Sequence, residues 1–190
     1  MKVLFVAALA EEVVALADHV PVLELGVGKV QAATTLAARL SRDPVDLVIN
    51  VGTAGGLTGQ PVGEVVEVAQ VHQHDFDHRG VSAFVGRSLP GGPIELPGPP
   101  GATGRLATGD RIVMDAGERA RLAVQADVVD MEGYAVAATS LAFEREVWLV
   151  KAVSDSADTG TVGSWADALA LCSERLAAWA GGRGVLDATR

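Results

Sequence analysis

The stretch Val129-Asp130-Met131-Glu132-Gly133-Tyr134-Ala135 follows an apolar run and leads into an alanine-rich segment. This pattern predicts a strand that ends here and a helix from Glu132 to Phe143. Asp130 and Glu132 then stand at a strand-to-helix junction, at the edge of the sheet where α/β proteins bind ligands. A purely structural interpretation is also open, in which Asp130 caps the helix and Glu132 complements its dipole.

The composition describes a chain with ample apolar material and an acidic surface. Of the 190 residues, 49% are hydrophobic but only 4% are aromatic, so the core must be aliphatic. The length predicts one domain over residues 1–190. The formal net charge of -9 argues against a sequence-independent nucleic-acid binder and against an anionic membrane surface. A single cysteine, Cys172, excludes an internal disulfide and a cysteine-built zinc site, and fits the reducing cytoplasm.

Apolar runs without polar alternation predict buried strands, and helical segments separate them. The run at 2–8 is of this kind, and the mostly apolar segments 22–27, 46–51, 124–129 and 147–153 are expected to be further strands. The first run also resembles a short signal peptide ending in Ala8-Leu9-Ala10, but we favour a strand because the run is short and only one positive charge precedes it. No run has the length needed to span a bilayer. Alternating strands and helices predict a layered α/β fold.

Carboxylates and small residues follow several of these strands. Glu11 and Glu12 follow the first strand and begin a helix through Ala17, and Asp155 follows the last strand. The run Gly52-Thr53-Ala54-Gly55-Gly56-Leu57 is expected to be a turn that lets a planar ligand approach the backbone. Each feature alone is explained by a cap, a turn or a first-turn acid. A single cleft that collects all of them together with Glu132 is the simpler interpretation.

Two motifs invite interpretations that we do not favour. Gly26-Val27-Gly28-Lys29-Val30 precedes a helix at 31–40 but lacks the third glycine and the acidic residue of a dinucleotide fingerprint, so no cofactor is expected. A long strand at 62–71 runs into His72-Gln73-His74-Asp75-Phe76-Asp77-His78, which has metal-ligand residue types. A solvated polar strand end is the more common explanation, so no metal is expected.

Three further segments complete the pattern. Residues 86–104 hold most of the prolines and predict an irregular loop that is mobile or acts as a lid, without a domain boundary. A strand pair or bend is expected at 104–113 and a short helix at 116–122. The last helix is expected at 164–180, with Trp165 and Trp179 as packing residues.

Taken in order, the motifs resemble the purine nucleosidase and nucleoside phosphorylase superfamily, and most closely its 5′-methylthioadenosine/S-adenosylhomocysteine nucleosidase family. The matching pieces span nearly the whole chain: Ala10-Glu11-Glu12-Val13, Gly26–Val30, Val51–Leu57, Thr108-Gly109-Asp110, Asp130-Met131-Glu132-Gly133 and Val153-Ser154-Asp155-Ser156-Ala157-Asp158. The resemblance implies a three-layer α/β/α sandwich with a central mixed, partly barrel-like sheet. It also implies a homodimer.

The resemblance further implies hydrolysis of a purine nucleoside, with roles for individual residues. Glu12 would bind the attacking water, Asp155 would act as general acid at the purine N7, and Glu132 would bind the ribose hydroxyls. Other substrate contacts would come from Thr53, Ala54, Gly55, Ile112, Met131, Lys151 and Ser154. This agrees with the chemistry, because carboxylates stabilise an oxocarbenium-like sugar and a protonated acid neutralises the leaving base. Burial among apolar neighbours would give Asp155 the raised pKa that this needs.

Departures from the family pattern leave alternatives open. Lys151 stands where the nucleosidases often have arginine, and Ile112 stands where a phenylalanine commonly stacks on the base. A futalosine-type hydrolase is therefore one alternative. Phosphorolysis is another, although Lys29 rather than arginine in the glycine turn favours water. A nucleoside-binding protein without turnover is a third, but binding alone does not need three carboxylates.

Overall fold

The computed structural model describes residues 1–157 and 165–189. Asp158 and Ser164, which belong to the predicted last motif and last helix, lie outside this part of the chain. The strands are β1 (Val3–Ala7), β2 (Val22–Glu24), β3 (Leu47–Gly56), β4 (Val65–Gln73), β5 (Ile94–Glu95), β6 (Gly104–Thr108), β7 (Val128–Asp130) and β8 (Glu146–Asp155). The helices are α1 (Val14–Ala17), α2 (Lys29–Arg42), α3 (His78–Val85), α4 (Ala116–Ala123), α5 (Gly133–Ala142) and α6 (Trp165–Gly182), with short 3₁₀ turns η1 (Ala10–Glu12) and η2 (Leu186–Thr189).

Five strands close into a mixed ring. β3 pairs with β8, β8 with β4, β4 with β6, β6 with β7, and β7 again with β3. β1 and β2 extend the sheet from β3 in parallel, and β5 adds a short antiparallel edge to β4. This arrangement confirms the expected mixed, partly barrel-like sheet.

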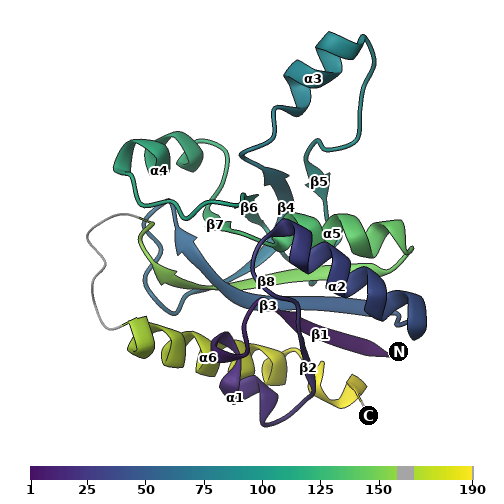
Figure 1. Cartoon of the computed structure of the whole chain (residues 1–190). Helices are drawn as coiled ribbons and strands as arrows, with labels where there is room; N and C mark the ends of the chain where they lie inside the picture. The colour runs from purple at the N-terminus through teal and green to yellow at the C-terminus, as the bar shows by residue number, and fades with distance from the viewer. Residues whose placement is uncertain (158–164, 190) are drawn as a thin grey trace.

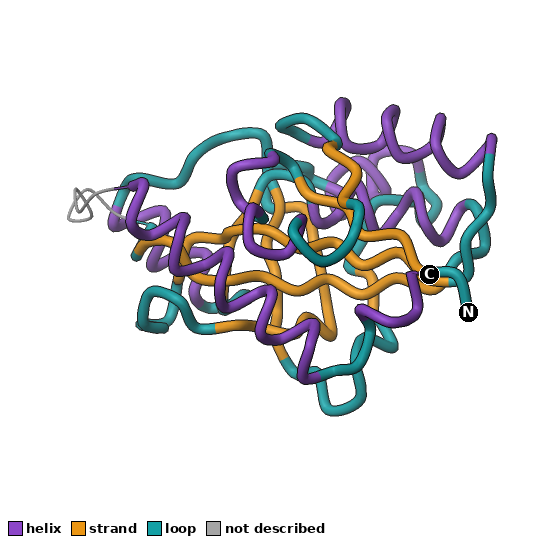
Figure 2. Tube along the Cα trace, turned by 90° about the horizontal axis from the view of Figure 1, so that it is seen from below, coloured by secondary structure: helices purple, strands orange, loops and turns teal. Residues whose placement is uncertain are grey.

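Helices cover both faces of the sheet (Figure 1). α2 and α5 lie on one face, where Leu36 and Val136 share a core with Val48. α1 and α6 lie on the other, where Leu16 and Leu176 share a core with strands β1, β3 and β8. Seen from below, the long helix α6 lies across the strands (Figure 2). The three-layer α/β/α sandwich is therefore confirmed.

The first apolar run is a strand inside the sheet. All five residues of β1 are buried, and the strand pairs with β2 on one side and β3 on the other. Such a strand is covered on both faces, which explains its unbroken hydrophobicity. None of the helices within the described residues is long and apolar enough to cross a membrane.

Several predicted boundaries are wrong. The glycine-rich run at 52–56 is not a turn, because β3 continues through Gly56 by pairing with β8 along its length and with β7 at its end. The strand expected at 124–129 begins only at Val128, because the backbone after α4 still turns back onto Leu122. The helix expected from Glu11 is split into η1 and α1. At 104–113 the strand pair is not formed, but the alternative prediction of a bend is confirmed, because β6 ends at Thr108 and the chain bends at Asp110 and Arg111.

One segment stands away from the body of the molecule. Residues 74–93, here called the α3 arm, leave the end of β4 and carry α3 outward (Figure 1). No residue of α3 is buried. The arm returns to the sheet through β5, which pairs with β4 at Gln70 and Val71. The predicted irregular loop at 86–104 therefore contains a short strand that anchors it.

Candidate active site

Parallel strand direction brings the predicted site residues to one edge of the sheet. β1, β3 and β8 are parallel neighbours, so their carboxyl ends lie together. Glu12 follows β1, Thr53 lies in β3, and Asp155 is the last residue of β8. β7 crosses the end of β3, where Val129 pairs with Gly55, and this brings the junction with Glu132 to the same edge.

Glu12 is held tightly against β3. Its Oε1 accepts hydrogen bonds from the backbone N–H of Thr53 at 2.8 Å and from the Thr53 hydroxyl at 2.5 Å. Its Oε2 accepts from the N–H of Leu9 at 3.1 Å. A Cβ at Gly52 would lie 3.3 Å from both carboxylate oxygens, so glycine there lets the buried carboxylate lie close against the strand.

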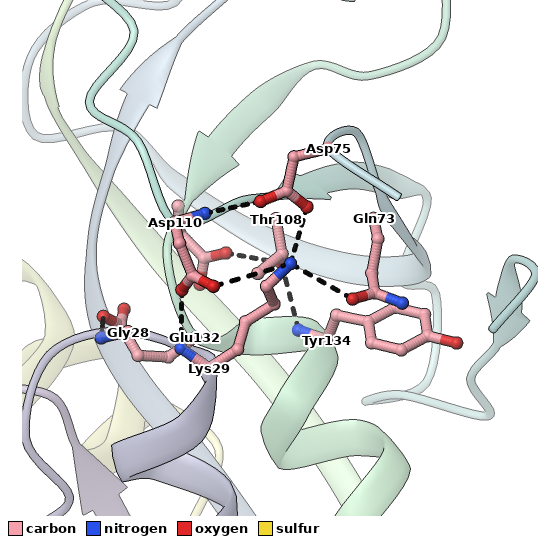
Figure 3. A network of polar contacts seen from close by, with 9 residues as sticks. Gly28, Lys29, Gln73, Asp75, Thr108, Asp110, Glu132 and Tyr134 are labelled. Carbon is pink, nitrogen blue, oxygen red and sulfur yellow. Dashed lines mark hydrogen bonds and ion pairs between the residues drawn. The ribbon is translucent and has the colours of Figure 1, made fainter. Parts of the chain in front are cut away.

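The two carboxylates of the opening motif have different roles. Asp130 accepts hydrogen bonds from the Thr108 hydroxyl at 2.6 Å and from the Gly133 N–H at 2.8 Å, and its Oδ2 lies 2.9 Å from Nζ of Lys151. The structural interpretation is thus correct for Asp130, which caps α5. Glu132 occupies the N-cap position but makes no side-chain cap; its Oε1 accepts instead from the Gly28 N–H at 2.7 Å (Figure 3).

Lys151 is the buried counter-charge of this region. Only 3% of its side chain is exposed, and 1% of that of its partner Asp130. Burial by itself favours the neutral amine, but the carboxylates of Asp130, Glu132 and Glu12 outweigh it, so the pKa of Lys151 is raised. Lys151 is therefore an ammonium ion bound to Asp130, and its contact with substrate stays a prediction.

Glu132 is poised to exchange a proton near neutral pH. Burial and the neighbouring Asp130 carboxylate raise its pKa to about 7, against the opposing influence of Lys151 and the Gly28 N–H. A buried carboxyl with such a pKa is typical of functional sites rather than of helix caps.

Asp155 differs from the other two carboxylates in being partly exposed. Its Oδ2 accepts from the Ser154 hydroxyl at 2.7 Å and its Oδ1 from the Ala157 N–H at 2.7 Å. A Cβ at Gly55 would lie 3.2 Å from Oδ1, so glycine again allows a carboxylate to approach β3. Among residues 1–157 and 165–189, Asp155 is only partly enclosed, in contrast to the expected burial among apolar neighbours.

The remaining predicted contacts are distributed unevenly. Thr53 and Gly55 are partly exposed on one side of β3, whereas Ala54 between them is buried. Met131 is partly exposed beside Glu132, and Ser154 is buried where it orients Asp155. Ile112 is 73% exposed and packs into no core, so the structure does not bring it into an enclosed base pocket.

The histidine-rich stretch serves structural contacts. Asp75 pairs with Lys29 at 2.6 Å, Asp77 caps α3 through the Gly80 N–H, and Nε2 of His78 lies 2.6 Å from the Leu89 carbonyl oxygen. Among residues 1–157 and 165–189, no group of three or more His, Cys, Asp or Glu side chains is placed to hold a metal ion. A cavity of about 580 Å³ beside the α3 arm is lined by His72 and His78 and by none of the site carboxylates.

Sequence reasoning missed the contacts that hold the carboxylates in place. Gly28 donates its N–H to Glu132, Gly52 makes room for Glu12, and Asp130 joins Lys151 to α5. The glycines at 28 and 52 were visible as motifs, but their partners lie 104 and about 40 residues away along the chain. Such pairings follow from strand order and are not encoded in local spacing.

The fold is that of an α/β protein with buried carboxylates near one edge of its sheet. The chain belongs to the phosphorylase superfamily, whose family model matches residues 3–180. It is 33% identical over 178 residues to the 5′-methylthioadenosine/S-adenosylhomocysteine nucleosidase of Haemophilus ducreyi, covering 82% of this chain and 75% of that protein. It is 34% identical over 161 residues to the enzyme of that name from Bacillus subtilis, covering 73% and 69%.

Solved structures show the same architecture. A Neisseria meningitidis 5′-methylthioadenosine/S-adenosylhomocysteine nucleosidase in complex with methylthio-immucillin-A superposes with a TM-score of 0.80 at 25% identity, covering 98% of this chain and 97% of that one. The futalosine hydrolase of Helicobacter pylori superposes with a TM-score of 0.83 at 21% identity, covering 97% of each chain. The predicted family membership is therefore confirmed.

Proposed function

We propose that this protein is a nucleosidase that hydrolyses the N-glycosidic bond of purine nucleosides, with substrates like 5′-methylthioadenosine and S-adenosylhomocysteine. The observation that carries the proposal is the meeting of Glu12, Glu132 and Asp155 at one sheet edge in a chain whose relatives bear that name. Residues 1–190 would act as one unit, because the site draws on segments from Glu12 to Asp155.

Glu12 is proposed to bind and activate the attacking water. The Thr53 N–H and hydroxyl and the Leu9 N–H fix its carboxylate in position. A carboxylate held in this way needs no reorganisation when the water approaches the sugar. Lys151, bound to Asp130, would support the site by balancing the charge of the carboxylates and would not contact the water itself.

Glu132 and Met131 are proposed to hold the ribose. The Gly28 N–H occupies Oε1 of Glu132, and we assign the ribose hydroxyls to Oε2. Negative charge beside the sugar stabilises the oxocarbenium-like transition state as the glycosidic bond breaks. With a pKa of about 7, Glu132 supplies that charge most fully above neutral pH.

Asp155 is proposed to protonate the leaving purine at N7. Its position at the end of β8 leaves it partly exposed to a ligand, while Ser154 and Ala157 set its orientation. Proton transfer by a positioned acid typically contributes about 10²–10⁴-fold in rate. Thr53, Ala54 and Gly55 would line the pocket for the nucleoside.

A futalosine-type hydrolase is the second candidate. The exposed Ile112 offers no aromatic face for an adenine, and this leaves room for a different purine conjugate. Phosphorolysis is disfavoured because the cation of the site, Lys151, is already bound to Asp130 and would have to leave it to bind phosphate.

We further propose a cytoplasmic homodimer without cofactor or metal. Phe84, Val81 and Val85 project from the α3 arm with 92%, 39% and 48% of their surfaces exposed, and they lie at helical spacing on one face. A second copy of the chain would cover this face. The buried, unpaired Cys172 is compatible with a reducing compartment.

The test is incubation of the purified protein with a panel of purine nucleosides, with and without phosphate and a chelator, followed by identification of the released base and sugar. We expect free base and unphosphorylated sugar at rates that neither phosphate nor chelator changes. Sugar 1-phosphate would assign phosphorolysis, and release only from futalosine would assign the second candidate. Loss of activity with chelator would restore a metal at His72–His78.

A further inference from the structure

Three segments far apart in the sequence meet at the Lys29 side chain (Figure 3). Its Nζ lies 2.6 Å from Oδ1 of Asp75, 3.2 Å from Oε1 of Gln73 and 3.7 Å from Oδ2 of Asp110. Lys29 begins α2, Gln73 ends β4, Asp75 lies at the start of the α3 arm, and Asp110 follows β6. One ammonium group therefore ties a helix start to the ends of two strands.

The backbone closes this network. Oδ1 of Asp110 accepts the Lys29 N–H at 2.8 Å, and the Asp110 N–H donates to Oδ2 of Asp75 at 2.9 Å. Lys29, Asp75 and Asp110 thus form a closed loop of contacts, in which each residue is bonded to both of the others. We call these three residues the Lys29 clamp.

The residue before the clamp is the one that holds Glu132. Gly28 has φ +88°, a conformation that glycine adopts readily and other residues rarely do, and a Cβ there would lie 3.2 Å from Oδ1 of Asp110. Its N–H donates to Oε1 of Glu132 at 2.7 Å. Lys29, fixed through both its backbone and its side chain, anchors the peptide that follows Gly28, so only the φ and ψ rotations of Gly28 lie between the clamp and the N–H that Glu132 accepts.

Local preferences do not explain this lysine. A cation in the first turn of a helix opposes the helix dipole, and an acidic residue is favoured there. The clamp lysine is also more enclosed than an ordinary surface ion pair: 17% of its side chain and 23% of that of Asp75 are exposed, against 53% and 48% for Lys2 and Asp43. An unfavourable helix position combined with three tertiary partners indicates a role outside α2 itself.

We propose that Lys29, Asp75 and Asp110 are positioning residues that hold the Gly28 N–H on Glu132 and so aim the Glu132 carboxylate at the sugar hydroxyls. The inference rests on the proposed nucleosidase function. It gives a role to three motifs that the proposed reaction leaves unused: the glycine turn at 26–30, the polar end of β4 and Thr108-Gly109-Asp110.

The kinetic test compares a ribonucleoside with its 2′-deoxy and 3′-deoxy analogues. Lys29→Met should reduce the preference of kcat/KM for the ribonucleoside by about tenfold, because the hydrogen bond that orients a charged acceptor is lost. Glu132→Gln should reduce this preference by a similar factor, and the double variant should show little further reduction beyond either single variant. Lys29→Arg should restore part of the preference, and Lys2→Met, which breaks the exposed pair with Asp43, should leave it unchanged. If Lys29→Met lowered kcat/KM by the same factor for the ribonucleoside and for both deoxy analogues, the proposal would be overturned.

A second measurement is independent of activity. A double-mutant cycle of Lys29→Met and Glu132→Ala, read by urea unfolding, should show non-additive changes in the free energy of unfolding, because Glu132→Ala removes the acceptor of the Gly28 N–H that the clamp is proposed to hold. Asp75→Asn replaces Lys29→Met if the latter does not fold. Additive changes would refute the clamp whatever the substrate is. A wild-type protein that splits no nucleoside, with a non-additive cycle, would refute the proposed function and leave the clamp in place.

Discussion

The acidic edge of the sheet and the α3 arm differ in how far their side chains are buried and hydrogen-bonded. At the edge, the carboxylates of Glu12 and Glu132 are buried and bonded to backbone N–H groups of segments distant in the sequence. On the arm, the eight residues of α3 have no buried member, and Phe84 is 92% exposed.

The difference shows which region of the molecule finds its interaction partners within one chain. The edge has its hydrogen-bond partners and its counter-charge, Lys151, already in place, so its geometry is preorganised. The apolar face of the arm, formed by Val81, Phe84 and Val85, is left exposed by the described part of the chain, which is typical of an interaction surface. Substitutions at the edge should therefore change chemistry and stability, whereas those on the arm should change association.

The largest effect is expected for Asp155→Asn. Turnover should fall by about 10³-fold because the acid for the leaving base is removed. The fold should persist, since the amide oxygen of asparagine can still accept the Ala157 N–H. Steady-state rates and circular dichroism measure the two properties, with the exposed Asp18→Asn as matched control. Near-normal turnover would remove Asp155 from the general-acid role.

Lys151→Met should have the next largest effect, on stability. Loss of the ammonium leaves Asp130 buried without its counter-charge, which typically costs about 3–5 kcal/mol. Urea unfolding at pH 7 measures the change. The matched control is Lys2→Met in the exposed pair with Asp43, where a change of at most about 1 kcal/mol is expected. If both variants lost the same free energy of unfolding, burial of the Lys151–Asp130 pair would not increase its contribution to stability.

The pH dependence of stability tests the electrostatics of Glu132. Its pKa in the folded protein is raised from 4.5 to about 7, so the folded state binds the proton more tightly than the unfolded chain. The stability that this carboxyl contributes is present below pH 4.5 and is lost as pH rises through 7.

Glu132→Gln removes this dependence. The free energy of unfolding of the variant minus that of the wild type should therefore rise between pH 4.5 and 7, by an amount on the order of 2 kcal/mol. Urea titrations at half-unit pH intervals measure it. A difference that stays constant, or that falls with pH, would contradict the raised pKa.

The smallest effect on the chain itself is expected for Phe84→Ser. An exposed side chain contributes little to folding, so the free energy of unfolding of the monomer should change by no more than about 0.5 kcal/mol. Self-association should weaken by about tenfold or more if the arm is the dimer contact. Sedimentation velocity over a concentration series measures this, and Val14→Ser on the opposite face of the sheet is the control. Unaltered association would place the interface elsewhere.

Much of the fold could be predicted because its strands are buried on both faces. The apolar run at 3–7 and the mostly apolar run at 147–153, interrupted only by Lys151, mark such strands. The glycine-rich end of β3 was misjudged, because a run of small residues is locally typical of a turn and only pairing with β7 and β8 keeps it extended. The boundary near Val124 was wrong for a local reason, because the N–H groups of Gln125 and Ala126 bond back to the Leu122 carbonyl and delay the start of β7 to Val128.

The sequence by itself determined the layered α/β class, the family and the residue types at the strand ends, because hydrophobic period and short motifs are local properties of the chain. Only the tertiary structure decided that Asp130 caps α5 and binds Lys151 while its neighbour Glu132 turns to Gly28. It also decided that Lys29 joins Asp75 and Asp110. The physical reason is that ionisation and hydrogen bonding depend on burial and on partners brought together through space, and chain spacing specifies neither.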